Sequence, residues 1–196
     1  MIAISRKKPV EDCLLFEPIS RNKIRPSLVC KCYNPLQKCT FYPFFQVKLY
    51  DLRSFDKGPF VTFNLPRENQ CEWTGLKFSP NGKSILLATN GSVMRLIEAF
   101  NGEPLQTFAG HLNNKGIPVD GCFSPDSRLV FSGSTDGRIH VWDADSGYKV
   151  CVLNGGHIGP VQCVQFNPNF MMMASACSHL NMWLPNLSDP TIMPKN

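Results

Sequence analysis

The sequence contains no long hydrophobic run. None of its apolar stretches approaches the ~18 consecutive residues of a membrane-spanning helix, so we expect no membrane partner. Residues 1–16 lack the apolar core of a secretory signal, so we expect no export. Without export, the nine cysteines predict reduced thiols that pack as small core residues, and not a framework of disulfides.

The motifs of the common enzyme classes are missing as well. The sequence has no glycine-rich phosphate loop, no paired catalytic carboxylates and no histidine cluster with metal-ligand spacing. We therefore predict that the chain is not an enzyme and binds no cofactor. A zinc site at Cys30, Cys32 and Cys39 would need a fourth ligand, and residues 1–46 offer only Cys13, so we predict no metal either.

Excess positive charge is confined to the N-terminal part of the chain. The formal net charge is +5, and residues 1–46 hold eight Lys or Arg against three Asp or Glu. Residues 47–196 are balanced, which removes the electrostatic argument for direct binding to nucleic acid. Two explanations of the basic segment 1–46 stay open: a disordered arm, or translated non-coding sequence upstream of Val47.

A repeat organises the rest of the chain. Phe78, Phe123 and Phe166 are separated by 45 and 43 residues, and each precedes a Pro-Asn or Pro-Asp turn flanked by alternating strands. Gly-His early in such a period and Trp-Asp late in it are the signature of a WD repeat. We therefore predict an all-β fold, a WD-repeat β-propeller.

The repeats define the expected blades. Whole four-stranded blades are predicted at 73–108 and 119–153, half a blade at 47–63, and a blade without its fourth strand at 161–184. Residues 47–187 would then form an incomplete propeller, an open arc of about three blades where a ring commonly has seven. Residues 188–196 are a C-terminal tail.

The best copy of the repeat predicts a buried hydrogen-bond relay. Asp136 would accept from the His111 ring, and His111 would meet the Ser132 hydroxyl, which would accept from the Trp142 indole. A hydrolase triad is the competing interpretation of these residue types, but the sequence has no nucleophile elbow and the repeat accounts for all of them.

The last repeat keeps only part of this pattern. It has His157 and Trp183, but Cys177 and the two residues after it replace the turn aspartate. We therefore expect its relay to be incomplete. Glu72, Thr135 and Pro160 fall in connections near the propeller axis, where partners of propellers commonly bind, and we take them as candidate partner contacts.

Several runs resemble one family over about 140 of the 196 residues. They are LYDLRSFDKGPF at 49–60, CEWTGLKF at 71–78, TNGS at 89–92, GRIHVW at 137–142, ASACS at 174–178 and WLP at 183–185. These runs are similar to the WD-repeat subunits of COMPASS-type complexes, which methylate lysine 4 of histone H3, and they match the C-terminal half of that family.

The resemblance implies a nuclear, non-catalytic scaffold. It also implies three protein partners: a histone methyltransferase catalytic subunit, a protein phosphatase 1 complex, and the serine-phosphorylated tail of RNA polymerase II. The alternative is a generic WD-repeat adaptor in another assembly, such as a ubiquitin ligase.

Overall fold

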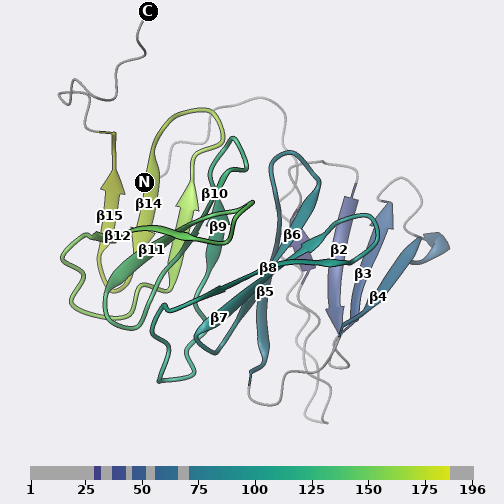
Figure 1. Ribbon diagram of the computed structural model, residues 1–196, viewed down its shortest axis with the longest axis horizontal. Helices are drawn as coiled ribbons and strands as arrows, with labels where there is room; N and C mark the ends of the chain where they lie inside the picture. Colours follow the sequence, from purple (N-terminus) through teal and green to yellow (C-terminus); the bar gives the residue numbers. More distant parts are fainter. Residues whose placement is uncertain (1–28, 32–36, 43–45, 52–55, 66–70, 186–196) are drawn as a thin grey trace, which may run out of the picture.

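The protein is an all-β molecule built from four sheets. A computed structural model describes residues 29–31, 37–42, 46–51, 56–65 and 71–185. These residues form fifteen strands in four antiparallel sheets, three with four strands and one with three (Figure 1). The predicted fold class is thereby confirmed. No helix in these ranges is long and apolar enough to cross a membrane.

The first sheet reaches into the segment that we expected to be free of strands. Its order is β1 (Val29–Lys31), β2 (Gln37–Tyr42), β3 (Gln46–Asp51) and β4 (Val61–Asn64). β2 pairs with β3 along its whole length, from Gln37 opposite Asp51 to Tyr42 opposite Gln46. Residues 29–31 and 37–42 of the basic segment 1–46 are thus strands of this sheet, and not a disordered arm. The physical reason is the inner edge of β3, whose backbone groups need partners.

Those two strands complete what the sequence predicted as half a blade. The strand pattern was present, since Cys39 and Phe41 alternate with polar Lys38 and Thr40, but no Pro-Asn turn marks it. The other residues of the predicted segment 1–46, except Gln46, lie outside the described residues, as does the tail 188–196.

The second and third sheets are the predicted whole blades. The second consists of β5 (Trp73–Phe78), β6 (Ser84–Thr89), β7 (Val93–Glu98) and β8 (Pro104–Ala109). The third consists of β9 (Gly121–Phe123), β10 (Leu129–Ser132), β11 (Arg138–Asp143) and β12 (Lys149–Asn154). The fourth sheet has β13 (Cys163–Phe166), β14 (Met173–Ala176) and β15 (Leu180–Trp183), and the described residues add no fourth strand to it.

The predicted turns connect the first two strands of these sheets. Between β5 and β6, the Ser79 hydroxyl donates to the Asn81 side chain at 2.7 Å and accepts from the Ser84 amide at 2.9 Å. Between β9 and β10, Ser124 bonds Asp126 and Leu129 in the same way. A short polar side chain that bonds nearby backbone stabilises a tight reversal, which explains why the same turn recurs with each repeat.

The sheets follow one another across Figure 1, from β2, β3 and β4 on the right to β14 and β15 on the left. β1 contacts β5, β5 contacts β9, and β9 contacts β13. This succession is the arrangement of propeller blades around an axis. Because neighbouring strands are antiparallel, the connections between blades share one rim with those between the second and third strands of a blade, and Glu72, Thr135 and Pro160 lie in such connections.

Each space between sheets holds one cluster of buried apolar side chains. Successive residues of a strand point to opposite faces, so one strand supplies two clusters. Val130 of β10 packs between the second and third sheets, whereas Phe131 packs between the third and fourth. β11 divides likewise, with Trp142 on one side and Val141 on the other. Burial on both faces explains the adjacent apolar pairs Val130–Phe131 and Val141–Trp142 in these strands.

Candidate functional site

The rings of the predicted relay gather around Trp142, which is 1% exposed. The His111 ring meets Trp142 edge-on, with 6.0 Å between centroids, and His140 stacks on Trp142 at 5.8 Å. Lys149 places its ammonium 5.5 Å from the centre of the Trp142 ring. Ser132 is also fully buried. The structure therefore brings two of the four predicted residues, His111 and Trp142, into ring contact and buries a third, Ser132.

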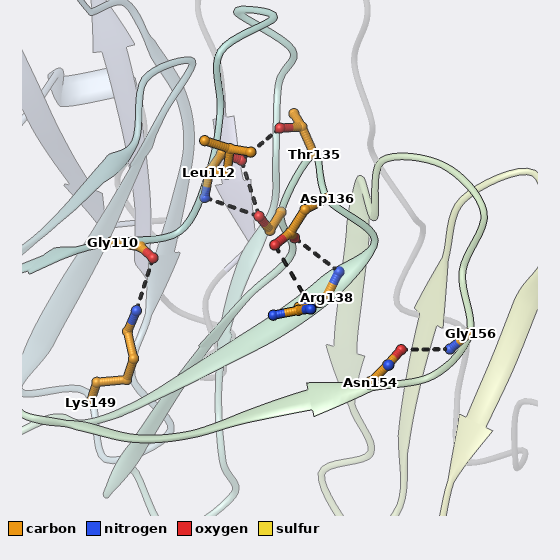
Figure 2. A network of polar contacts seen from close by, with 9 residues as sticks. Gly110, Leu112, Thr135, Asp136, Arg138, Lys149, Asn154 and Gly156 are labelled. Atoms are coloured by element: carbon orange, nitrogen blue, oxygen red, sulfur yellow. Dashed lines mark hydrogen bonds and ion pairs between the residues drawn. The ribbon is translucent and has the colours of Figure 1, made fainter.

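Their hydrogen bonds differ from the prediction. The Ser132 hydroxyl donates to the Gly133 carbonyl at 2.9 Å, and Nδ1 of His111 has no hydrogen-bond partner among the described residues. Asp136 accepts from the Arg138 backbone amide at 3.1 Å and lies 4.0 Å from the Arg138 guanidinium, as Figure 2 shows. The physical reason is the position of Asp136 in an exposed turn, where Arg138 engages its oxygens before His111 can.

Burial governs the charge of this group. It lowers the pKa of the His111 imidazole to about 4, so the ring is neutral near pH 7. Burial alone would raise the pKa of Asp136, but hydrogen bonds from the Ser134 hydroxyl and the Arg138 amide lower it below its ordinary value. A neutral imidazole beside an ionised carboxylate that serves the turn is a packing arrangement and not a proton-transfer pair.

Ser134, which the sequence analysis overlooked, connects the 110–118 loop to the turn before β11. Its hydroxyl accepts from the Leu112 amide at 3.0 Å and donates to the Leu112 carbonyl at 3.1 Å. Thr135 donates to the same carbonyl from its amide at 2.8 Å and from its hydroxyl at 2.9 Å (Figure 2). Thr135 is thus buried and holds a loop in place. The one available signal was the hydroxyl pair directly before the Asp-Gly turn.

The other two candidate contact residues lie at the surface. Glu72 is exposed, and its backbone is held by Asn90 through two hydrogen bonds, one to the Asn90 side chain at 2.7 Å and one from the Asn90 amide at 2.9 Å. Pro160 is half-buried in the connection between β12 and β13. Both positions fit a partner contact, which stays a prediction.

A continuous relay forms in the last blade, where we expected none. The Trp183 indole donates to the Ser175 hydroxyl at 2.8 Å, and that hydroxyl lies 2.8 Å from Nε2 of His157. Nδ1 of His157 then lies 3.1 Å from the Cys177 sulfur. The prediction of an incomplete relay is therefore wrong. Cys177 takes the place of the turn aspartate, because its sulfur can accept the hydrogen bond that a carboxylate would accept.

The partners of His157 decide which nitrogen carries its proton. The Asn181 side-chain amide donates to the Gly155 carbonyl at 2.7 Å and lies 3.3 Å from Nε2 of His157. Nε2 therefore accepts, the Ser175 hydroxyl donates to it, and the ring proton is on Nδ1. The His157 Nδ1–H points at the Cys177 sulfur, and the His179 backbone amide donates to the same sulfur at 3.4 Å. Two N–H donors converge on one sulfur.

These contacts set the pKa of the thiol. The His179 backbone amide lowers the pKa of Cys177, burial opposes that effect, and side-chain hydrogen bonds from His157, Ser178 and His179 bring it to about 6. Burial raises the pKa of Cys122 to about 11 and also raises the pKa of Cys151 and Cys163. Cys177 therefore differs from these three thiols in its charge near pH 7.

The described residues contain no group of three or more Cys, His, Asp or Glu side chains that could hold a metal ion.

Comparison with known proteins supports the assignment of these sheets as propeller blades. Residues 102–143 match the family "WD domain, G-beta repeat". The chain is 69% identical over 139 residues to WD repeat-containing protein 82 of Drosophila melanogaster. The aligned region covers 71% of this chain and 44% of the relative. It is 37% identical over 140 residues to Protein ANTHESIS POMOTING FACTOR 1 of Arabidopsis thaliana, covering 71% and 42%.

A third relative is COMPASS component SWD2 of Saccharomyces cerevisiae, with 28% identity over 149 residues, 67% of this chain and 44% of the relative. The chain thus spans less than half the length of each of these three relatives. Residues 102–143 thus form a WD repeat within an all-β chain of propeller blades, and the chain is similar to WD repeat-containing protein 82 over most of its length.

Proposed function

We propose that this chain is a non-catalytic WD-repeat scaffold subunit of a nuclear COMPASS-type complex that methylates lysine 4 of histone H3. The observation that carries the proposal is the 69% identity with WD repeat-containing protein 82, supported by the similarity to the yeast COMPASS component. The nuclear location, the chromatin substrate and the partners all belong to this proposal.

The polar residues inside the blades support a scaffold over an enzyme. The Ser132 hydroxyl is fully buried and donates to the Gly133 carbonyl, so it is not poised against a base. The Ser175 hydroxyl is equally buried and is held between Trp183 and His157. Residue types that could serve a hydrolase are used here to satisfy buried polar groups.

Protein partners would find apolar anchors on the surface. Phe100, in the connection between β7 and β8, is 83% exposed, and Tyr148, in the matching connection between β11 and β12, is 79% exposed. Exposed aromatic side chains are characteristic of protein interfaces. We propose these positions, and the connections that contain Glu72 and Pro160, as docking points, with Thr135 supporting the neighbouring loop.

We further propose three partners: a histone methyltransferase catalytic subunit, a protein phosphatase 1 complex, and the phosphorylated tail of RNA polymerase II. The test is affinity purification of the tagged full chain from nuclear extract, followed by identification of bound proteins and an assay for methylation of histone H3. We expect methyltransferase subunits and lysine-4 methylation in the eluate. Recovery of ubiquitin-ligase subunits without methyltransferase would instead favour a generic WD-repeat adaptor.

A pair of charge-reversal variants tests whether Glu72 itself contacts a partner. Glu72→Lys alters a candidate contact, whereas Asp56→Lys makes the same change at an exposed carboxylate of the connection between β3 and β4, which contains none of the proposed docking points. We expect Glu72→Lys to weaken recovery of one partner and Asp56→Lys to leave it intact. Equal recovery by both variants would remove Glu72 from the interface.

A further inference from the structure

We propose that Cys177, on whose sulfur two N–H groups converge, is a site of covalent modification by small electrophiles and hydroperoxides, and that its modification loosens the last blade. This inference is independent of the proposed function. It rests on the geometry around the sulfur, on access to it, and on what depends on its hydrogen bonds.

The geometry requires the sulfur to act as an acceptor. The Nδ1–H of His157 and the backbone amide of His179 both point at it. The proton on Nδ1 is fixed from the far side of the ring, because Nε2 accepts from Ser175 and Asn181. Two converging donors stabilise the negatively charged form of a thiol. The pKa of about 6 agrees with this arrangement.

The sulfur is also within reach of small reagents. Cys177 is half-buried in the turn between β14 and β15, and Ser178, His179 and Leu180 beside it are exposed. Exposure alone does not distinguish it, since Cys151 and Cys163 are more exposed. Their thiols are protonated at neutral pH, because burial raises their pKa. The same chain thus supplies two accessible control thiols without a histidine partner in the described contacts.

The chemistry is ordinary thiolate substitution. With a hydroperoxide, a sulfur lone pair attacks one oxygen, the O–O bond breaks, and the other oxygen leaves as hydroxide or alkoxide, giving a sulfenic acid. With iodoacetamide, the S–C bond forms as the C–I bond breaks and iodide leaves. In both cases the sulfur loses the negative charge that accepts from His157 and His179.

Loss of the hydrogen-bond acceptor at Cys177 affects β15, the outer strand of the last blade. His157 is linked through Ser175 to Trp183, and directly to Asn181, and both of these residues belong to β15. Once the sulfur is modified, the His157 Nδ1–H has no acceptor and the ring can turn away. The hydrogen bonds of Ser175 with β15 would then weaken, which lowers the stability of the blade.

The first experiment labels the native full chain with iodoacetamide between pH 5 and pH 8.5 and measures the rate at each cysteine by peptide mapping. We expect the Cys177 rate to reach half its plateau near pH 6, whereas the rates of Cys151 and Cys163 keep rising through pH 8. At pH 6 we expect Cys177 to react on the order of tenfold faster, after allowing for the weaker nucleophilicity of a low-pKa thiolate. Parallel pH profiles for the three thiols would overturn the proposal.

Two variants distinguish the effect of the His157–Cys177 hydrogen bond from a general loss of folding. His157→Gln removes the Nδ1–H donor and should move the Cys177 midpoint to higher pH. Cys177→Asp keeps an acceptor for His157 and removes the nucleophile. We expect iodoacetamide or hydrogen peroxide to lower the melting temperature of the wild-type chain and leave that of Cys177→Asp unchanged. An unchanged wild-type melt after complete labelling of Cys177 would refute the link to the blade, and the wild-type pH profile decides the matter even if His157→Gln fails to fold.

Discussion

Nδ1 of His157 lies 3.1 Å from the sulfur of Cys177, whereas Nδ1 of His111, the matching histidine of the preceding blade, has no hydrogen-bond partner in the described part of the chain. Two histidines at the same place in the repeat are therefore used differently. His111 is a buried neutral ring packed against Trp142, and His157 is a hydrogen-bonding link between a turn and an outer strand. The residues in the following turns differ likewise, since Asp136 accepts from the Arg138 amide whereas Cys177 lies against His157.

We predict that Ser175→Ala destabilises the chain by about 1–3 kcal/mol, because the buried Trp183 N–H and one His157 nitrogen lose their common partner. Urea titration followed by tryptophan fluorescence measures this cost. Thr107→Ala, which removes an exposed hydroxyl from β8, is the control and should change stability by no more than about 0.5 kcal/mol. Equal effects of the two changes would show that the relay contributes nothing.

We predict that the free energy of unfolding falls as the pH is lowered from about 6.5 to about 4. Burial lowers the pKa of His111 from 6.5 to about 4, so over this window the unfolded chain binds a proton that the folded chain excludes. Stability therefore rises with pH across it, by up to about 3 kcal/mol for this residue. Burial also lowers the pKa of His140, which acts in the same direction.

Urea titrations at half-unit steps of pH, on the wild-type chain and on His111→Gln, measure that dependence. The variant should show a shallower slope between pH 4 and pH 6.5. An identical slope would place the responsible group elsewhere. Asp126 and Asp136 do not confuse the result, since hydrogen bonds lower their pKa and their contribution is lost only at lower pH.

We predict that Gly133→Ala loosens the contact between the third and fourth sheets. A Cβ added to Gly133 would collide with the backbone carbonyl of Val161, which can yield only if the two sheets move apart. Overpacking of this kind costs about 1–3 kcal/mol. Gly159→Ala is the control, because a Cβ there meets no atom within 4 Å. Thermal melts of the two variants that coincide would contradict the close approach.

Much of this fold is predictable from the sequence, because alternation and turn chemistry recur with each repeat. Phe78, Phe123 and Phe166 each end the first strand of a sheet, as their spacing predicts. β1 and β2 were missed because no Pro-Asn turn marks them, and their assignment depends on β3 offering an edge. The relay of the last blade was missed for a chemical reason. The WD motif has aspartate at the position of Cys177, whereas the hydrogen bond of His157 requires only an acceptor there.

The outer edge of β15 leads to the last prediction, which is that the isolated chain associates with itself. β15 pairs with β14 on one side, and the described residues place no strand on its other side. Leu180, Met182 and Leu184 are 59%, 57% and 72% exposed along or just beyond this strand. Unpaired strand edges bind other strands, and exposed apolar side chains favour association.

Size-exclusion chromatography over a range of concentrations tests this directly. We expect the apparent mass to rise with concentration, and Met182→Lys to reduce the rise because a charged side chain on an edge opposes strand addition. Phe100→Lys is the control, since Phe100 is at least as exposed but lies in a connection of the second sheet, away from β15. Association reduced equally by both changes would point to general hydrophobicity and not to the edge. A single mass near 22.0 kDa at every concentration would show that another part of the chain covers β15.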